Sequence, residues 1–216
     1  MSSINDSGYL SVEIDEWIEK HRKKALPWFE LCESINKFSH SIMFSIEVHN
    51  KYLPELIAAS LYVRSMSCFQ GVIIMAERGM INEAKSLLRC LLECMFTIVA
   101  IHKDENVAMQ LVLGDLLQRK DYLKAYKRTK EGQITHESKP SLEDIERLMQ
   151  DIENSIQKEK VIKLTKRDLA EKAGLATIYD TAYKLLSSTI HANVRDLEQY
   201  LDLNKSNEVK KILWGP

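Results

Sequence analysis

Residues 87–101, LLRCLLECMFTIVAI, are the most apolar stretch of the sequence, with 12 of 15 positions hydrophobic. A helix that is apolar on every side has to be buried on every side. The stretch also contains Arg89 and Glu93 and is shorter than a membrane span requires. It therefore predicts a central core helix, around which the other helices of a globular domain pack.

Apolar residues recur at helical spacings of three and four along most of the chain. Only 7 glycines and 4 prolines occur among 216 residues, too few for a strand-and-turn architecture. We therefore expect an all-α fold, a single-domain bundle of about seven helices in which the long helices pack antiparallel. The expected helices cover residues 12–51 with a break before Pro27, 54–78, 81–102 with Asn82 as a cap, 105–130, 141–160, 165–172 and 176–202.

The expected organisation has three parts. Residues 1–51 form N-terminal helices that pack on a helical core spanning residues 52–203, and residues 204–216 form a C-terminal tail. The segment EGQITHESKPS, near residues 131–141, combines glycine, proline and charge with little to bury, which predicts a mobile loop inside the core.

Composition excludes several classes of function. The formal net charge is −1, so no global positive field gathers nucleic acid, and any such binding has to come from a local patch. The sequence starts without an apolar signal core, so the 4 cysteines are interpreted as free thiols of a cytoplasmic protein with no membrane segment. Cys90 and Cys94 are four residues apart, but no second Cys or His pair has ligand spacing, and we expect neither a metal nor a cofactor.

Two charges interrupt the apolar core helix. Arg89 and Glu93 are one turn apart, so their side chains share a face. An unpaired buried ion costs several kcal/mol, so the charges must be paired or must face a polar pocket. One interpretation is a structural ion pair that ties neighbouring helices together. The other is that Arg89 presents its guanidinium to an anion while Glu93 orients it. Periodicity alone does not separate them.

A second interruption occurs in YDTAYKLLSSTIHANVRDL, residues 179–197. Its apolar seam advances by three and four, and Ser187, His191 and Arg195 form a polar stripe beside that seam. Such a stripe is typical of a solvated face. The small residues around His191, however, leave room for a partner helix or a ligand, and we expect its side chain to lie in a pocket within a few ångströms of Arg89 and Glu93.

Together, SLLRCLLE and YDTAYKLLSSTIHANV resemble a prokaryotic helical family of unknown function that is related to the HEPN superfamily. The motif of that family is an Arg-x-x-x-Glu helix followed by a helix with Tyr, Ser and His at fixed spacing. The resemblance covers roughly residues 55–202. The matching positions in this sequence are Arg89, Glu93, Tyr183, Leu186, Ser187, Ser188 and His191.

The resemblance implies an activity. Many HEPN-type proteins are metal-independent RNA endonucleases of toxin–antitoxin and anti-phage defence systems, and they usually act as dimers. By this likeness His191 would be the general acid/base and Arg89 the phosphate-binding group. Glu93, Tyr183, Ser187 or Ser188, and Arg195 would be positioning residues. The implied partners are a second copy of the chain, an RNA substrate and a protein encoded nearby.

The sequence departs from the nuclease pattern in one respect. Active HEPN nucleases carry an arginine four to six residues before the histidine, where this chain has Leu185, Leu186 and Ser187. Arg89 or Arg195 would have to replace that arginine. The alternative hypothesis is a non-catalytic helical interaction module, in which Arg89, Glu93 and His191 form a buried structural network and the chain acts through a protein partner.

Overall fold

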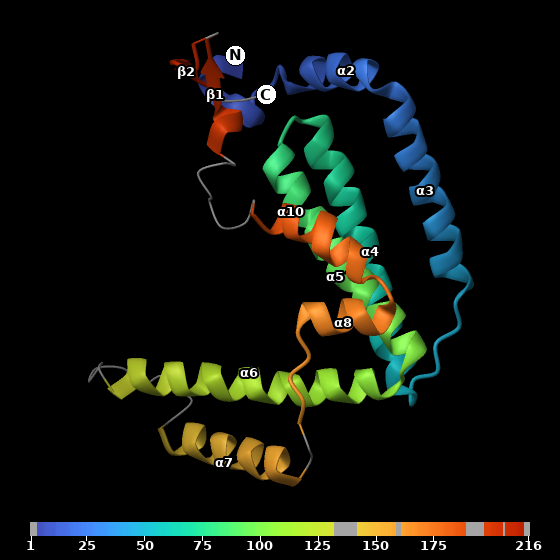
Figure 1. Ribbon diagram of the computed structural model, residues 1–216, viewed down its shortest axis with the longest axis vertical. Helices are drawn as coiled ribbons and strands as arrows, with labels where there is room; N and C mark the ends of the chain where they lie inside the picture. Colours follow the sequence, from blue (N-terminus) through green and yellow to red (C-terminus); the bar gives the residue numbers. More distant parts are fainter. Residues whose placement is uncertain (1–3, 132–141, 159–160, 189–196, 205, 214–216) are drawn as a thin grey trace.

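The computed structural model describes residues 4–131, 142–158, 161–188, 197–204 and 206–213. The predicted all-α fold is confirmed, because long helices make up most of the described chain (Figure 1). In chain order the elements are α1 (Ile4–Ser7), the 3-10 turn η1 (Gly8–Leu10), α2 (Ile14–Lys24), α3 (Leu26–Ser45), α4 (Leu53–Glu77), α5 (Ile81–Lys103), α6 (Asn106–Glu131), α7 (Leu142–Lys158), α8 (Lys166–Ala173), α9 (Ala176–Ile178), the π-helical turn η2 (Tyr179–Tyr183), α10 (Lys184–Ser188), the 3-10 turn η4 (Glu198–Tyr200), β1 (Leu201–Leu203) and β2 (Val209–Ile212).

The centre of the molecule is the antiparallel pair α4 and α5 (Figure 1). The turn between them depends on Gly79, whose φ of 77° is a left-handed conformation that suits glycine at a helix end. The indole of Trp17 on α2 packs against this glycine and leaves no space for a Cβ. Farther along the pair, Gly71 lies against Leu87, which lets the two helices approach closely.

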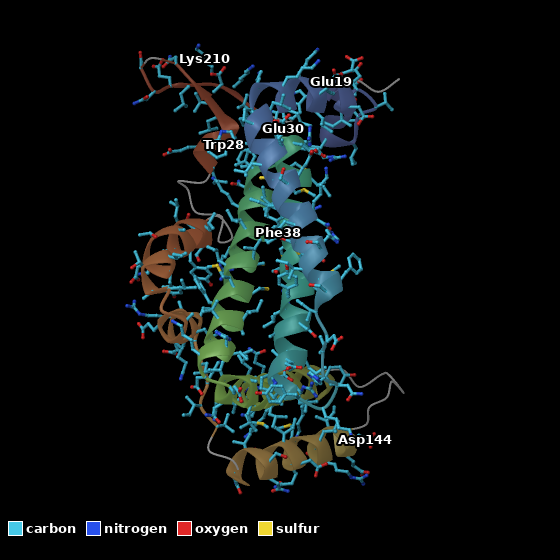
Figure 2. All side chains as sticks on the ribbon, turned by 90° about the vertical axis from the view of Figure 1, so that its right-hand side faces the viewer. Glu19, Trp28, Glu30, Phe38, Asp144 and Lys210 are labelled. Atoms are coloured by element: carbon cyan, nitrogen blue, oxygen red, sulfur yellow. The ribbon has the colours of Figure 1, made fainter. Side chains whose placement is uncertain are left out.

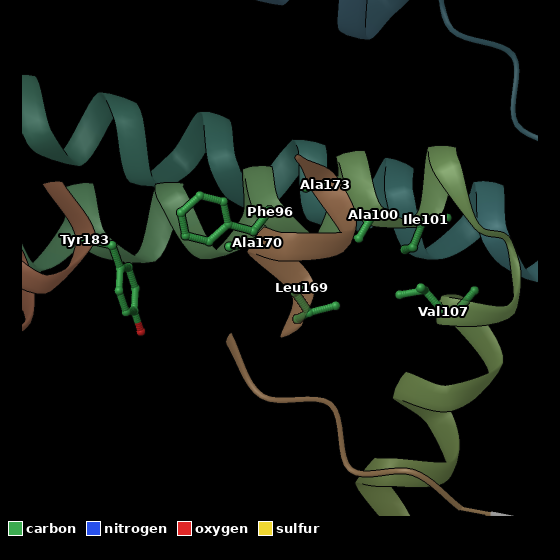
Figure 3. Close-up of a cluster of buried hydrophobic side chains, with 9 residues drawn as sticks. Phe96, Ala100, Ile101, Val107, Leu169, Ala170, Ala173 and Tyr183 are labelled. Atoms are coloured by element: carbon green, nitrogen blue, oxygen red, sulfur yellow. The ribbon is translucent and has the colours of Figure 1, made fainter. Parts of the chain in front are cut away.

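The buried core lies where α5 meets α8 and the start of α6 (Figure 3). Helix α8 begins with a capping box, in which the Thr165 hydroxyl accepts from the Asp168 amide and the Asp168 carboxylate accepts from the Thr165 amide. It ends at Gly174, with a φ of 73°. The buried cluster comprises Phe96, Ala100, Ile101, Val107, Ala108, Leu169, Ala170, Ala173 and Tyr183.

Helices α6 and α7 form a second antiparallel pair that crosses the end of the α4–α5 pair (Figure 1). Lys120 pairs with Glu153 and Lys127 with Glu146, each with a nitrogen–oxygen distance of 2.6 Å. Nearly all of the loop expected near residues 131–141, which would join these helices, lies outside the described residues.

Among the described helices, α4 has the length and apolar composition of a membrane span, with a mean hydropathy of 1.4 over its best window. Core helices of globular proteins meet the same criterion, so composition alone does not establish a span. In this structure α4 packs along α5.

The C-terminal region differs from the prediction. A helix was expected over residues 176–202, but residues 201–203 form β1, which pairs antiparallel with β2. The side-chain oxygen of Asn204 accepts from two backbone amides in the turn, and Asn207 has a φ of 60°. Strands of three and four residues are too short to show an alternating pattern in the sequence.

The predicted cap of α5 was also wrong. The N-cap position is Met80, and Asn82 makes no cap: its amide donates to the Tyr200 hydroxyl at 2.9 Å, which links the start of α5 to the turn before β1.

Candidate functional site

Arg89 and Glu93 form the ion pair that their spacing on α5 predicts. The Arg89 Nη2 lies 3.2 Å from the Glu93 Oε1, and the two side chains are 23% and 20% exposed. They stand at the edge of the core, where water reaches them in part. Neither charge is isolated in an apolar environment.

Tyr183 joins this pair from the π-helical turn η2. Its hydroxyl accepts a hydrogen bond from the Arg89 Nη2 at 2.8 Å and donates one to the Glu93 Oε1 at 2.9 Å. The Arg89 guanidinium carbon also lies 5.0 Å from the centre of the Tyr183 ring, within the range of a cation–π interaction. One aromatic side chain therefore contacts both charged groups.

The wide turn η2 explains how Tyr183 is held. The Lys184 amide bonds to the Tyr179 carbonyl five residues back, the hydrogen-bond pattern of a π-helix. Tyr179 and Tyr183 stack with ring centres 4.8 Å apart, and Phe96 on α5 meets the Tyr183 ring edge-on at 5.9 Å. The ring is thus clamped between its own helix and α5, which fixes the position of its hydroxyl.

Burial raises the pKa of the Tyr183 hydroxyl, and the hydrogen bond to the Glu93 carboxylate raises it further. Arg89 acts in the opposite direction, more weakly. The net shift keeps the phenol protonated at neutral pH, so Tyr183 acts as a hydrogen-bond donor to Glu93 and has no phenolate with which to attack a substrate.

Ser187 completes the contacts of Arg89. Its hydroxyl accepts from the Arg89 Nε at 3.1 Å and donates to the Tyr183 carbonyl at 2.8 Å. The neighbouring Ser188 donates instead to the Leu185 carbonyl on its own helix. Ser187 is therefore the serine that contacts the ion pair.

Lys166 is a site residue that the sequence did not indicate. Its ammonium lies 3.0 Å from the Glu93 Oε2, the carboxylate oxygen that faces away from Arg89. Lys166 is the first residue of α8, and the capping box at Thr165 fixes where that helix begins. With Arg89, Lys166 and Glu93 together, the site carries a net charge of +1.

Part of the Arg89 guanidinium makes no hydrogen bond with the described residues. Its hydrogen bonds with described residues use Nε and Nη2, and Nη1 has no such bond in the described part of the chain. A guanidinium fixed on one side and positively charged overall can bind an oxyanion, such as a phosphate, with its remaining N–H groups.

The structure brings together four of the predicted site residues: Arg89, Glu93, Tyr183 and Ser187. Two others, His191 and Arg195, lie outside the described residues, so the expected contact between His191 and Arg89 stays a prediction.

No group of three or more potential metal ligands occurs within the described ranges. Cys94, one of the two cysteines with metal-like spacing, is buried among the core helices, and burial raises the pKa of its thiol. A buried thiol of raised pKa is a poor metal ligand.

Comparison with known proteins gives one match. The chain matches no curated protein and no solved structure at a significant level. A family model, described as a family of unknown function (DUF5677), matches residues 55–209. The match includes α5, α8, η2 and α10, and thus every described residue of the site, whereas α2 and α3 precede it. The chain belongs to this family, DUF5677.

Proposed function

We propose that this chain is a HEPN-like, metal-independent endoribonuclease of a prokaryotic defence or toxin–antitoxin system, and that Arg89 binds the scissile phosphate. The observation that carries the proposal is the fixed guanidinium. Ser187, Tyr183 and Glu93 hold Arg89 in one orientation within a site of net positive charge. Such a preorganised cation can stabilise the charge that develops on phosphate oxygens in a transition state.

His191 supplies the proton transfer in this proposal. It follows Ser187 by four residues in the sequence, and the proposal requires its imidazole to reach a phosphate that Arg89 binds. The imidazole takes the proton of the ribose 2′-hydroxyl, and the 2′-oxygen attacks the adjacent phosphorus. The bond to the 5′-oxygen breaks and that oxygen takes up a proton, which leaves a 2′,3′-cyclic phosphate and a 5′-hydroxyl end.

The remaining residues have supporting roles. Ser187 and Tyr183 orient Arg89, and Glu93 fixes both Arg89 and Lys166. Ser188 and Arg195 are positioning residues on the same segment of the chain as His191. The reaction needs no metal, because a histidine and an arginine provide both the proton transfer and the charge stabilisation.

A cleavage assay tests this function. Purified protein is incubated with tRNA, mRNA and total RNA in the presence of EDTA, and the product ends are analysed. We expect cleavage that leaves 2′,3′-cyclic phosphates, and we expect His191→Ala to abolish it while the melting temperature stays within a few degrees. Expression of the active protein should arrest growth, and the same variant should relieve the arrest. Wild-type protein that leaves all three RNAs intact would refute the proposal.

One observation favours a second candidate, a non-catalytic interaction module. The Glu93 carboxylate is already engaged by Arg89, Tyr183 and Lys166, as in a purely structural network. In that case the chain acts through a protein partner. The first candidate for this partner is the product of a neighbouring gene. Wild-type protein that is harmless when overexpressed and has no nuclease activity would favour this function.

The proposal also includes the assembly and location of the protein. We place it in the cytoplasm, consistent with its free cysteines. We further propose that it is a homodimer, since a symmetric pair presents two copies of the Arg89 site to one RNA molecule.

A further inference from the structure

Glu93 contacts two cations, one at each oxygen of its carboxylate. The Glu93 Oε1 lies 3.2 Å from the Arg89 Nη2, and the Glu93 Oε2 lies 3.0 Å from the Lys166 Nζ. The two cations come from different helices, because Arg89 is part of α5 and Lys166 is the first residue of α8. The carboxylate therefore lies between a guanidinium and an ammonium and determines how far apart they are.

Lys166 is the most accessible of these three charges. Its side chain is 48% exposed, about twice the exposed fraction of Arg89 or Glu93. An ammonium carries three N–H donors, and the contact with Glu93 is the one ion pair that Lys166 makes within the described residues. Two of its donors therefore remain for a ligand that approaches from solvent.

The fold fixes the position from which Lys166 reaches Glu93. The capping box at Thr165 determines where α8 begins. Leu169 and Ala170, on the same helix, are buried against α5 (Figure 3). Figure 2 shows α8 and α10 side by side along α5, apart from α3. Because Lys166 stands on an anchored helix, a ligand that binds it has little backbone left to order.

The basic residues beside this pair of cations have carboxylate partners of their own. Arg167 lies 2.8 Å from Glu171, and Lys184 lies 2.7 Å from Asp180. The two cations at Glu93 share a single carboxylate instead, which leaves one positive charge without a counter-charge. The uncompensated charge of this region is therefore concentrated at the Glu93 cations, where it favours an anion.

The position of Glu93 also determines how an RNA chain can use the two cations. A single phosphate that touched both would approach the carboxylate between them, and like charges repel each other. Two phosphates avoid this repulsion if one binds Arg89 and the other binds Lys166, at the opposite carboxylate oxygen. Phosphates follow one another at every nucleotide of a strand, so one RNA strand can supply both.

We propose that Lys166 binds a second phosphate of the RNA, next to the phosphate that Arg89 binds. This inference rests on the proposed function and extends it: the substrate is a strand with at least two consecutive phosphates, and Glu93 sets the spacing at which they are bound. Lys166 contributes to the affinity for this strand, while Arg89 acts on the scissile phosphate. A dinucleotide with one phosphate lacks the second contact and is a poor substrate.

The salt dependence of RNA binding tests the inference. The probe is a labelled single-stranded 2′-O-methyl RNA, which cannot be cleaved because the attacking hydroxyl is blocked. Its affinity is measured by fluorescence anisotropy at several salt concentrations. Each phosphate contact with a single strand contributes about −0.7 to the slope of log affinity against log salt concentration.

We expect Lys166→Met to weaken binding about two- to fivefold at low salt. The slope should become shallower by about 0.7, because one phosphate contact is lost. Lys166→Gln also removes the charge but keeps a donor for Glu93, and it should give the same slope as Lys166→Met. Circular dichroism confirms that each variant is folded, and either of the two variants is sufficient for the test.

Lys172→Met is the matched control. Lys172 also lies on α8, its side chain is 41% exposed, and its Nζ lies 3.0 Å from Asp104, the distance that separates Lys166 from Glu93. The control thus removes the same charge and a comparable ion pair from the other end of the helix. We expect its slope to equal that of wild type.

A double variant separates a direct contact from an indirect one. In an Arg89→Met background, Lys166→Met should make the slope shallower by a further 0.7 or so, because the two residues bind different phosphates. No further change in that background would mean that Lys166 acts only by positioning Arg89, and the inference would be wrong.

Two other outcomes distinguish this inference from the function on which it rests. If wild type binds the RNA and Lys166→Met has the slope of wild type, Lys166 contacts no phosphate, and the role of Arg89 is unaffected. If wild type does not bind the RNA at low salt, the proposed function is refuted and the inference is refuted with it.

Discussion

Replacing Tyr183 with phenylalanine removes one oxygen atom and leaves the buried ring in place. That oxygen accepts a hydrogen bond from Arg89 at 2.8 Å and donates one to Glu93 at 2.9 Å. Hydrogen bonds to charged groups contribute about 1.5–3 kcal/mol each. Arg89 and Glu93 keep their direct contact at 3.2 Å and are partly hydrated, so water replaces some of the loss. We expect the free energy of unfolding to fall by about 1–3 kcal/mol.

Urea denaturation followed by circular dichroism measures this change. Tyr179→Phe is the control, because Tyr179 stacks on Tyr183 at 4.8 Å and its hydroxyl makes no hydrogen bond within the described residues. The control should lie within about 0.5 kcal/mol of wild type, as is usual for a change that removes no partner. If Tyr183→Phe is as stable as the control, the tyrosine does not bridge the ion pair, and the description of the site is wrong.

Three further predictions concern helix α8. Thr165→Ala removes its N-cap hydroxyl and should cost about 1 kcal/mol of stability in the same urea assay. Gly174→Ala forces a residue with a Cβ to adopt a φ of 73° and should cost about 1–2 kcal/mol, measured by thermal unfolding. Hydrogen bonds from Thr165 lower the pKa of Asp168 in the folded state, below the unfolded value of about 3.9. The stability that they provide is present above that pH and is lost as the pH falls through the folded pKa, so Asp168→Asn should flatten the decline of the urea midpoint below about pH 4.

The helices could be predicted from the sequence because their signals are local. Helix α5 was expected over residues 81–102 and covers Ile81–Lys103. The helices expected to end at residues 78 and 172 end at Glu77 and Ala173, each close to a glycine of positive φ. The C-terminal hairpin could not be predicted in this way, because its strands are short. Its anchor is a contact between Asn82 and Tyr200, which are 118 residues apart.

Four of the five residues of the described site were also indicated by the sequence. Arg89 and Glu93 were expected to share a helix face because they are four residues apart, and Tyr183 and Ser187 were matched to the motif of the family that the sequence resembles. The structure brings the two helices together at these residues. Lys166 was missed because its contact with Glu93 depends on how α8 packs against α5, which periodicity does not show. The π-helical turn was missed for a similar reason, since a bond five residues back leaves no mark on an apolar pattern.

The central claim is that Arg89 binds an RNA phosphate, and an anisotropy titration with a labelled 2′-O-methyl RNA tests it directly, because this RNA binds without being cleaved. Arg89→Met is compared with Arg119→Met, a control on α6 whose arginine is 67% exposed and paired with Asp115. A lost hydrogen bond to a charged group costs about 1.5–3 kcal/mol, which is about 10–150-fold in affinity. With both variants folded by circular dichroism, we predict that Arg89→Met weakens binding at least tenfold and that Arg119→Met leaves it nearly unchanged. Equal affinity for the three proteins, or no binding by wild type at about 50 mM salt, would contradict the claim.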